Sequence, residues 1–136
     1  EEVDILQRFK EDFKQSAKDD VKPVLSKDDL RQCQDLIEKV YIKDELVRYI
    51  ATITHNTRNH GDLFLGASPR ATLSILKTAK AIAGIHGRNF VIPEDIQFVA
   101  YPVLNHRLIL APEKEMEGYD AEDIIKEIIQ QIEVPR

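Results

Sequence analysis

The sequence has little of several residue types that mark particular classes of protein. Of its 136 residues, one is cysteine, five are glycine and none is tryptophan. A single cysteine excludes an internal disulfide, which fits a reducing, cytoplasmic location. No apolar run approaches the ~20 residues that a membrane helix needs, and no signal peptide is visible. Because the chain opens with Glu1 instead of methionine, we expect it to be part of a larger protein.

The chain also has fewer basic than acidic residues, 19 against 24. The formal net charge is −5 and the isoelectric point is about 5.4. Proteins that bind nucleic acid broadly depend on a basic surface, so this balance argues against that function. Hydrophobic residues make up 43% of the chain and charged residues 32%, which is typical of a globular domain.

Metal-ligating and nucleophilic patterns are sparse. The histidines His55, His60, His86 and His106 are scattered, and no two of them are spaced i, i+4 on a helix beside an acidic residue. We therefore expect no metal site. Cys33 falls on an apolar helical stripe, which predicts a buried small side chain and not a nucleophile.

The pattern of apolar residues predicts a chain that is almost entirely helical. Helices are expected over 2–17, from Ser26, over 44–58 with Asp44 as the cap, from Ser68 to a stop at Gly87, from Pro93 and from Asp120. Asp29 follows Ser26 by three residues, as in a capping box. Two short extended pieces, 41–42 and 90–92, could pair in parallel. The prediction is an all-α fold: a small bundle of about four to five helices, with at most a very short two-stranded parallel pairing.

Each predicted helix has an apolar face at helical spacing, and Pro102 should kink or restart the helix that contains it. The predicted inward residues are Ile5, Leu6, Phe9 and Phe13; Leu30, Cys33, Leu36, Ile37 and Val40; Leu46, Ile50, Ile53 and Thr57; Leu73, Ile75, Leu76, Ala79, Ile82 and Ala83; Ile96, Val99, Ala100, Val103 and Leu104; and Ile124, Ile125, Ile128, Ile129 and Ile132. The isoleucine stripe of the last helix is a core face or an exposed docking face. The first helix stands apart from the rest across a charged linker.

The start of the helix at Ser68 carries an unusual charge. Ser68 can cap the helix, and Pro69 suits its first position, where no N–H is needed. Arg70 then lies at the positive end of the helix dipole, where a cation is disfavoured by about 0.3–1 kcal/mol. This arrangement indicates that an anion, most simply a phosphate, binds there. The alternative is that Arg70 pairs with a nearby carboxylate of the chain.

Several motifs in order along the chain closely resemble the C-terminal lid of MoxR-type AAA+ ATPases. The resemblance covers about residues 20–135. The motifs that carry it are Pro23-Val24-Leu25-Ser26, Gly66-Ala67-Ser68-Pro69-Arg70-Ala71, Ala79-Lys80-Ala81, Gly87-Arg88, Val91-Ile92-Pro93-Glu94-Asp95-Ile96, Pro102-Val103-Leu104-Asn105-His106-Arg107 and Glu117-Gly118-Tyr119-Asp120.

The resemblance implies a role for this chain within a larger enzyme. The parent would be a hexameric ATPase of the chaperone-like remodelling kind, using ATP and Mg²⁺. The lid would be residues 19–136, and residues 1–18 would be the trailing helix of the ATPase core. Arg70 would be the sensor-2 arginine that contacts the ATP phosphates and couples hydrolysis to lid motion, with support from Gly66, Ser68 and Pro69.

The resemblance also implies partners. They would be the core domain of the same chain, neighbouring subunits and a von Willebrand factor A domain protein, without nucleic acid or membrane insertion. Arg88, His106 and Arg107 are candidate subunit or core contacts. Arg88 could instead cap the end of its helix, and Arg107 could form a salt bridge inside the lid.

The phosphate-binding motif of such ATPases is missing from this chain. No G-x-x-x-x-G-K-[ST] occurs in the sequence, and no acidic Walker B strand is visible. The chain therefore lacks the phosphate cradle and the magnesium site. We expect that it has no catalytic residues, does not hydrolyse ATP and does not bind it tightly.

A second hypothesis is a stand-alone helical protein-interaction or DNA-binding module. The run 89–95 followed by a helix also resembles the end of histone-like folds. A helix that binds a DNA groove needs several basic residues on one face, and the helix from Ser68 offers only Arg70, Lys77 and Lys80. Tight, salt-sensitive binding to random duplex DNA would favour this alternative.

Overall fold

The computed structural model describes residues 1–10 and 21–135. The chain divides into two compact units, Glu1–Cys33 and Gln34–Arg136, and the division falls inside a helix. The first unit holds α1 (Glu2–Phe9) and the start of α2 (Lys27–Glu38). The predicted continuation of the first helix to residue 17, with Phe13, lies outside the described residues.

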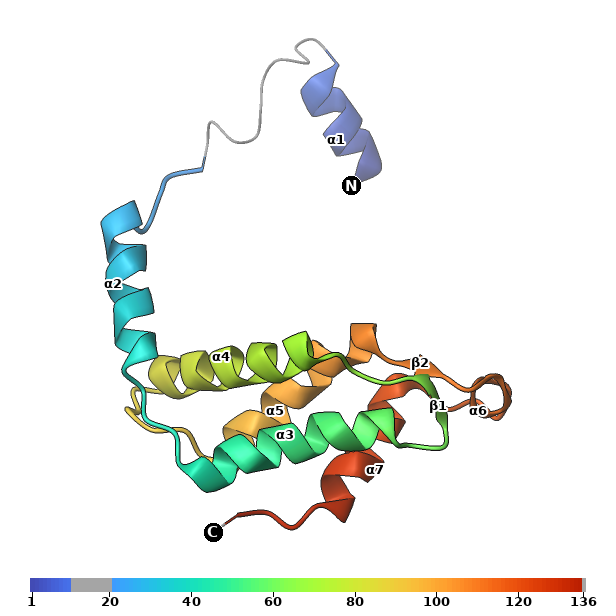
Figure 1. The fold of residues 1–136 in the computed structure, drawn as a ribbon. Coiled ribbons are helices and arrows are strands. Elements are labelled where there is room, and N and C mark those ends of the chain that lie inside the picture. Colours follow the sequence, from blue (N-terminus) through green and yellow to red (C-terminus); the bar gives the residue numbers. More distant parts are fainter. Residues whose placement is uncertain (11–20, 136) are drawn as a thin grey trace. The chain divides into compact units, whose positions relative to one another are not determined.

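The second unit is a helical bundle with a small sheet at one end (Figure 1). Its elements in chain order are α3 (Asp44–Arg58), β1 (Leu63–Leu65), α4 (Pro69–Ile85), α5 (Pro93–Leu104), a short 3-10 turn (Asn105–Arg107), β2 (Ile109–Leu110), α6 (Pro112–Met116) and α7 (Ala121–Gln131). The predicted all-α class is confirmed. The short helix α6 falls where a loop was expected. No described helix is both long enough and apolar enough to cross a bilayer.

The strand pairing differs from the prediction. The expected parallel pairing is present only as one isolated bridge between Tyr41 and Phe90. The two-stranded sheet is instead antiparallel, with Leu63 opposite Leu110 and Leu65 opposite Ile109. Each strand is too short for an alternation of apolar and polar residues to mark it. The two strands are also far apart in sequence, so no local pattern indicates that they pair.

The core of the second unit forms where α4 packs on α5 and where α3 and α7 close the other side. The predicted faces of α3, α5 and α7 are buried, apart from the half-buried Ile132, so the isoleucine stripe of α7 is a core face. On α4 the buried ladder is Ala71, Ile75, Ala79 and Ala83. Small residues at i, i+4 spacing let α5 pack closely against this ladder.

Five apolar residues predicted to be inward are exposed in the described part of the chain, and two of them are Ile5 and Leu6 of α1, at 54% and 71%. Leu73 is 58% exposed, because it lies off the alanine ladder of α4. Leu30 and Leu36 are 51% and 65% exposed, and α2 has no buried residue. Cys33 is exposed as well, so its predicted burial was wrong. An amphipathic stripe shows which side of a helix is apolar, but it does not show that another element covers it.

Helix ends follow the local chemistry of the sequence in most cases. Ser26 and Asp29 form the expected capping box, in which each backbone N–H donates to the other side chain at 2.8 and 3.1 Å. The predicted cap at Asp44 was wrong by one residue, since Lys43 takes that position. Gly87 has a φ of 71°, as expected for a helix stop. Helix α5 continues through Pro102 without restarting.

Candidate functional site at the start of helix α4

The first turn of α4 has the predicted backbone but not the predicted side-chain cap. Ser68 is the extended N-cap residue and Pro69 takes the first helical position. The Ser68 hydroxyl makes no capping hydrogen bond, so that prediction was wrong. The amide of Ala71, one of the two that such a hydroxyl could bind, donates to the Ser68 carbonyl at 2.9 Å instead.

The segment that leads into α4 is held against the end of α3. A Cβ atom on Gly66 would lie 2.4 Å from the carbonyl oxygen of Thr57 and 2.6 Å from the Cα of Arg58. Any side chain at this position would collide with backbone, so only glycine permits the approach. Gly66 therefore acts through close packing, a more specific role than the support predicted for it.

Two hydrogen bonds then fix the next residue, Ala67. Its N–H donates to the buried Thr57 hydroxyl at 2.9 Å, and its carbonyl accepts from the Arg58 guanidinium at 3.0 Å. We call Thr57, Arg58, Gly66 and Ala67 the α3–α4 clamp. The clamp sets the position of the α4 N-terminus relative to α3.

A second contact between hydroxyl groups joins the same two helices. The hydroxyl oxygens of Thr54 and Thr72 are 2.9 Å apart, and Thr54 is fully buried. Sequence reasoning placed Thr57 on the inner face of α3 but missed its partner, as well as Arg58 and Thr54. The available signal was a pair of hydroxyl side chains, Thr54 and Thr57, on an otherwise apolar buried face.

Arg70 projects from this fixed start of α4 into solvent. Its side chain is exposed, and it makes no hydrogen bond or ion pair with any residue that the structure describes. The alternative that Arg70 pairs with a carboxylate of the chain therefore finds no partner in those residues. Leu73 and Lys77, also exposed, lie on the same side of α4, at i+3 and i+7 from Arg70.

The first turn of α4 differs from the other helix starts in its charge. Acidic residues occupy the first turn of the six other α-helices in the described part of the chain, where they complement the helix dipole. The first turn of α4 contains no acidic residue and carries Arg70. The positive potential of the N–H groups and the guanidinium is thus left uncompensated at this point.

Arg88 has an internal partner in the structure. Its guanidinium binds the carboxylate of Asp95 through two bonds of 2.7 and 2.6 Å, and the Asp95 side chain is only 4% exposed. The same carboxylate accepts the N–H of Ile92 at 3.0 Å, which caps α5. Burial raises the pKa of Asp95, but the Arg88 and Ile92 hydrogen bonds outweigh it and hold that pKa below its usual range.

The backbone of Arg88 completes the end of α4. Its N–H donates to the Ala83 carbonyl at 2.9 Å, and the Gly87 N–H donates to Gly84, which together form a Schellman motif. Arg88 therefore ties the end of α4 to the start of α5. Its predicted contact with another subunit or the core stays a prediction.

The other two predicted contact residues lie at the end of α5. The Arg107 guanidinium donates to the carbonyl of Val103, one of the free carbonyls of the last helical turn. No carboxylate pairs with Arg107 among the described residues, so the salt bridge considered for it is absent there. His106 is exposed. Contacts of both residues outside this chain stay predictions.

Comparisons with known proteins agree with this structure. The AAA lid domain family matches residues 55–128. The chain is 38% identical over 135 residues to the uncharacterized protein YeaC of Bacillus subtilis, covering 99% of this chain and 41% of that protein. It is 32% identical over 124 residues to chaperone MoxR1 of Mycobacterium tuberculosis, covering 85% of this chain and 33% of that protein.

A solved structure has the same fold. The crystal structure of a proposed ATPase from Cytophaga hutchinsonii superposes with a TM-score of 0.80 at 32% identity, over 99% of this chain and 43% of that one. The chain thus spans less than half the length of each of these relatives. The matched family, the MoxR relatives and the shared fold lead to one conclusion: the chain belongs to the AAA lid domain family, as a lid of the MoxR type.

Proposed function

We propose that this lid places Arg70 on the phosphates of a bound ATP, as the sensor-2 residue of a MoxR-like AAA+ ATPase. The observation that carries the proposal is the exposed guanidinium, which has no counter-charge among the described residues and projects from a helix start that the α3–α4 clamp holds in place. A planar guanidinium binds two phosphate oxygens at once, which suits it to sense the state of the γ-phosphate.

The charge at the α4 start supports an anionic ligand. A cation in the first turn opposes the helix dipole and costs about 0.3–1 kcal/mol at an exposed site. A phosphate reverses the sign of this effect, since it interacts favourably with both the free N–H groups and the guanidinium. The lid tolerates Arg70 at this position because the parent protein supplies the anion.

The surface beside Arg70 fits a docking face for the ATPase core. Leu73 is 58% exposed and lies one helical turn after Arg70. If Arg70 contacts the nucleotide, this strip of α4 faces the core domain that holds it, and the core covers Leu73. Because the clamp fixes α4 to α3, a movement of the phosphates would turn the lid as a unit, which couples hydrolysis to lid motion.

The wider role concerns the longer protein. We expect a chaperone-like remodelling ATPase that uses ATP and Mg²⁺, forms a hexamer and works with a von Willebrand factor A domain partner in the cytoplasm. Residues 1–18 would be the trailing helix of its ATPase core. In that assembly Arg88, His106 and Arg107 would lie near the core or a neighbouring subunit. The likeness to chaperone MoxR1 supports this role.

An NMR titration of this chain with ATP and Mg²⁺ tests the proposed site. We expect selective, weak shifts of the amides from Leu65 to Thr72, and we expect Arg70→Ala to abolish them. The matched control is Arg48→Ala, which removes an exposed arginine from α3. Shifts centred elsewhere, or shifts that persist in Arg70→Ala, would contradict the role of Arg70. The absence of shifts would mean that the site forms only with the ATPase core.

A further inference from the structure

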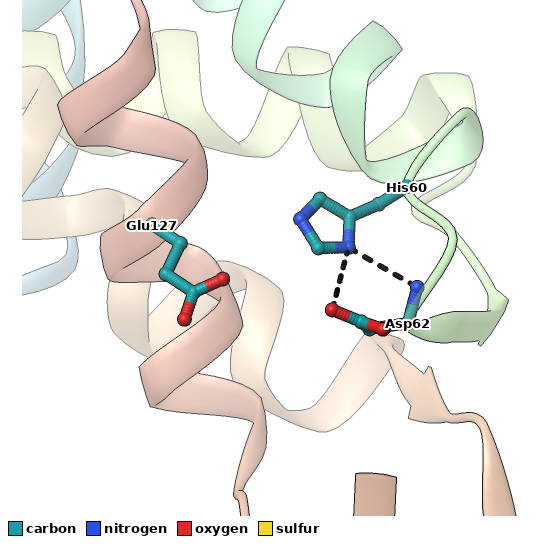
Figure 2. A group of neighbouring side chains, drawn as sticks. All are labelled: His60, Asp62 and Glu127. Carbon is teal, nitrogen blue, oxygen red and sulfur yellow. Dashed lines mark hydrogen bonds and ion pairs between the residues drawn. The ribbon is translucent and has the colours of Figure 1, made fainter. Parts of the chain in front are cut away.

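Three potential metal ligands meet just after the C-terminal end of α3, in the turn that follows Arg58 of the clamp. His60 and Asp62 lie in the turn between α3 and β1, and Glu127 projects from α7 toward them (Figure 2). One ligand atom from each residue lies within 4.8 Å of the others, and all three residues are half-buried. No motif in the sequence indicates this cluster, because Glu127 is distant in sequence from His60 and Asp62.

The backbone holds the turn in a fixed position. The Leu63 N–H donates to the His60 carbonyl at 3.2 Å, and the Asp62 carbonyl accepts from Ala111 at 2.9 Å. The Asp62 N–H also lies 3.3 Å from Nδ1 of His60. On the other side, Glu127 is anchored by the buried core face of α7. The three side chains are thus brought together by two separately packed elements, which reduces the entropy cost of binding an ion.

Negative charge outweighs positive charge around the cluster. Nδ1 of His60 is 3.9 Å from a carboxylate oxygen of Asp62. Lys114 forms a long ion pair with Asp62, at 4.0 Å, and its ammonium binds Glu117 more closely, at 2.9 Å. Glu127 has no hydrogen bond or ion pair among the described residues, although it is half-buried. A bound cation would compensate both carboxylates at once.

The ligand set indicates the kind of ion. One imidazole nitrogen with two carboxylate oxygens suits a first-row divalent ion such as Zn²⁺, whereas Mg²⁺ and Ca²⁺ prefer oxygen ligands alone. Zn²⁺ bonds nitrogen and oxygen at about 2.0–2.2 Å, so tetrahedral ligands lie about 3.4 Å apart. The separation of 3.9 Å between Nδ1 of His60 and the Asp62 carboxylate is close to that spacing, and ion binding through Nδ1 would replace the hydrogen bond that this nitrogen accepts from the Asp62 N–H.

We propose that His60, Asp62 and Glu127 form a divalent transition-metal site, with water completing the coordination. The ion would join the turn after α3 to α7. Because this turn continues through β1 into Gly66, the bound ion would stiffen the segment that leads to Arg70. The site does not depend on the proposed nucleotide role and can be tested without ATP.

The test is a Zn²⁺ titration of the untagged chain, measured by calorimetry together with NMR of the histidine side chains. Cys33 is exposed and could bind zinc by itself, so the experiment uses a Cys33→Ser background. We expect one saturable site per chain, ring shifts confined to His60, and no competition from Mg²⁺. Zinc should also raise the melting temperature of the chain.

Matched variants identify the ligands. Glu127→Gln and Asp62→Asn should each weaken Zn²⁺ binding by about tenfold or more. Glu133→Gln and His106→Asn, which change exposed residues outside the cluster, should leave it unchanged. Circular dichroism checks that each variant is folded. Non-saturable binding, ring shifts centred on another histidine, or equal affinity in Glu127→Gln and Glu133→Gln would overturn the proposal.

Discussion

Replacing Gly66 with alanine tests whether the α3–α4 clamp positions the start of α4. The added Cβ would lie 2.4 Å from the Thr57 carbonyl oxygen and 2.7 Å from the Arg58 nitrogen, and both are backbone atoms. Neither can move away by a side-chain rotation, so the segment must separate from α3 by about 1 Å to reach ordinary contact distance. The φ angle of Gly66 is not positive, so the effect isolates the lack of space.

The expected cost follows from the contacts that this movement disturbs. Overpacking costs about 1–3 kcal/mol. Moving the segment also weakens the hydrogen bonds of Ala67 to Thr57 and Arg58, each with a net contribution of about 1 kcal/mol. Alanine also lowers the conformational entropy of the unfolded chain, which offsets about 0.5 kcal/mol of this loss. We expect Gly66→Ala to lower the free energy of unfolding by about 2–4 kcal/mol.

Thermal and urea denaturation followed by circular dichroism measure this loss. A change of this size corresponds to a fall in melting temperature of about 5–15 °C. The matched control is Gly61→Ala, because a Cβ there meets no atom within 4 Å. If Gly66→Ala is no less stable than Gly61→Ala, the clamp does not hold α4 in the way described.

Further predictions concern Asp95, Gly84 and the chain as a whole. Asp95→Asn should destabilise the chain by about 2–4 kcal/mol, because it breaks a largely buried ion pair with Arg88; a loss as small as that of Glu94→Gln, an exposed neighbour, would contradict this. The pKa of Asp95 is held below its ordinary value of 3.8, so the contribution of its carboxylate to stability is complete above about pH 5 and is lost as the pH falls through the folded-state pKa. The melting temperatures of wild type and Asp95→Asn should therefore converge in acid and stay apart at neutral pH. Gly84→Ala should stabilise α4 by about 0.5–1 kcal/mol, since the new methyl makes only an ordinary 3.6 Å contact with Ile37, and a loss of stability would show that this contact is too tight. The chain alone should release no phosphate from ATP in a coupled assay, and sustained hydrolysis by purified chain would refute this.

The helices that the sequence predicts well are those with a continuous apolar face. In α5 and α7 the inward residues recur at helical spacing, α5 begins at Pro93 as expected, and Asp120 caps α7. The spacing of apolar residues within one helix depends only on neighbouring positions, so a single sequence is sufficient to reveal it. The same reasoning failed for Leu73 and Cys33, because whether an apolar residue is covered depends on packing between elements that are distant in sequence.

In the candidate site, too, features set by local sequence could be predicted and features set by tertiary contacts could not. The place of Arg70 in the first turn of α4 could be predicted, because Ser68 and Pro69 mark a helix start. The roles of Thr57 and Arg58 could not, since they act on Ala67 through tertiary contacts. The small sheet, and the meeting of His60 with Glu127, likewise arise only when the chain folds.

The most direct test of the account is ATP hydrolysis by the longer protein that carries this lid together with an ATPase core. The account predicts that Arg70→Ala lowers kcat at least about 10²-fold, as expected when a group that stabilises phosphate charge in the transition state is removed. Arg70→Lys should recover only part of the rate, because lysine keeps the charge but loses the planar fork. Arg48→Ala should behave as wild type. A wild-type rate of hydrolysis in Arg70→Ala would contradict the claim that Arg70 contacts the nucleotide.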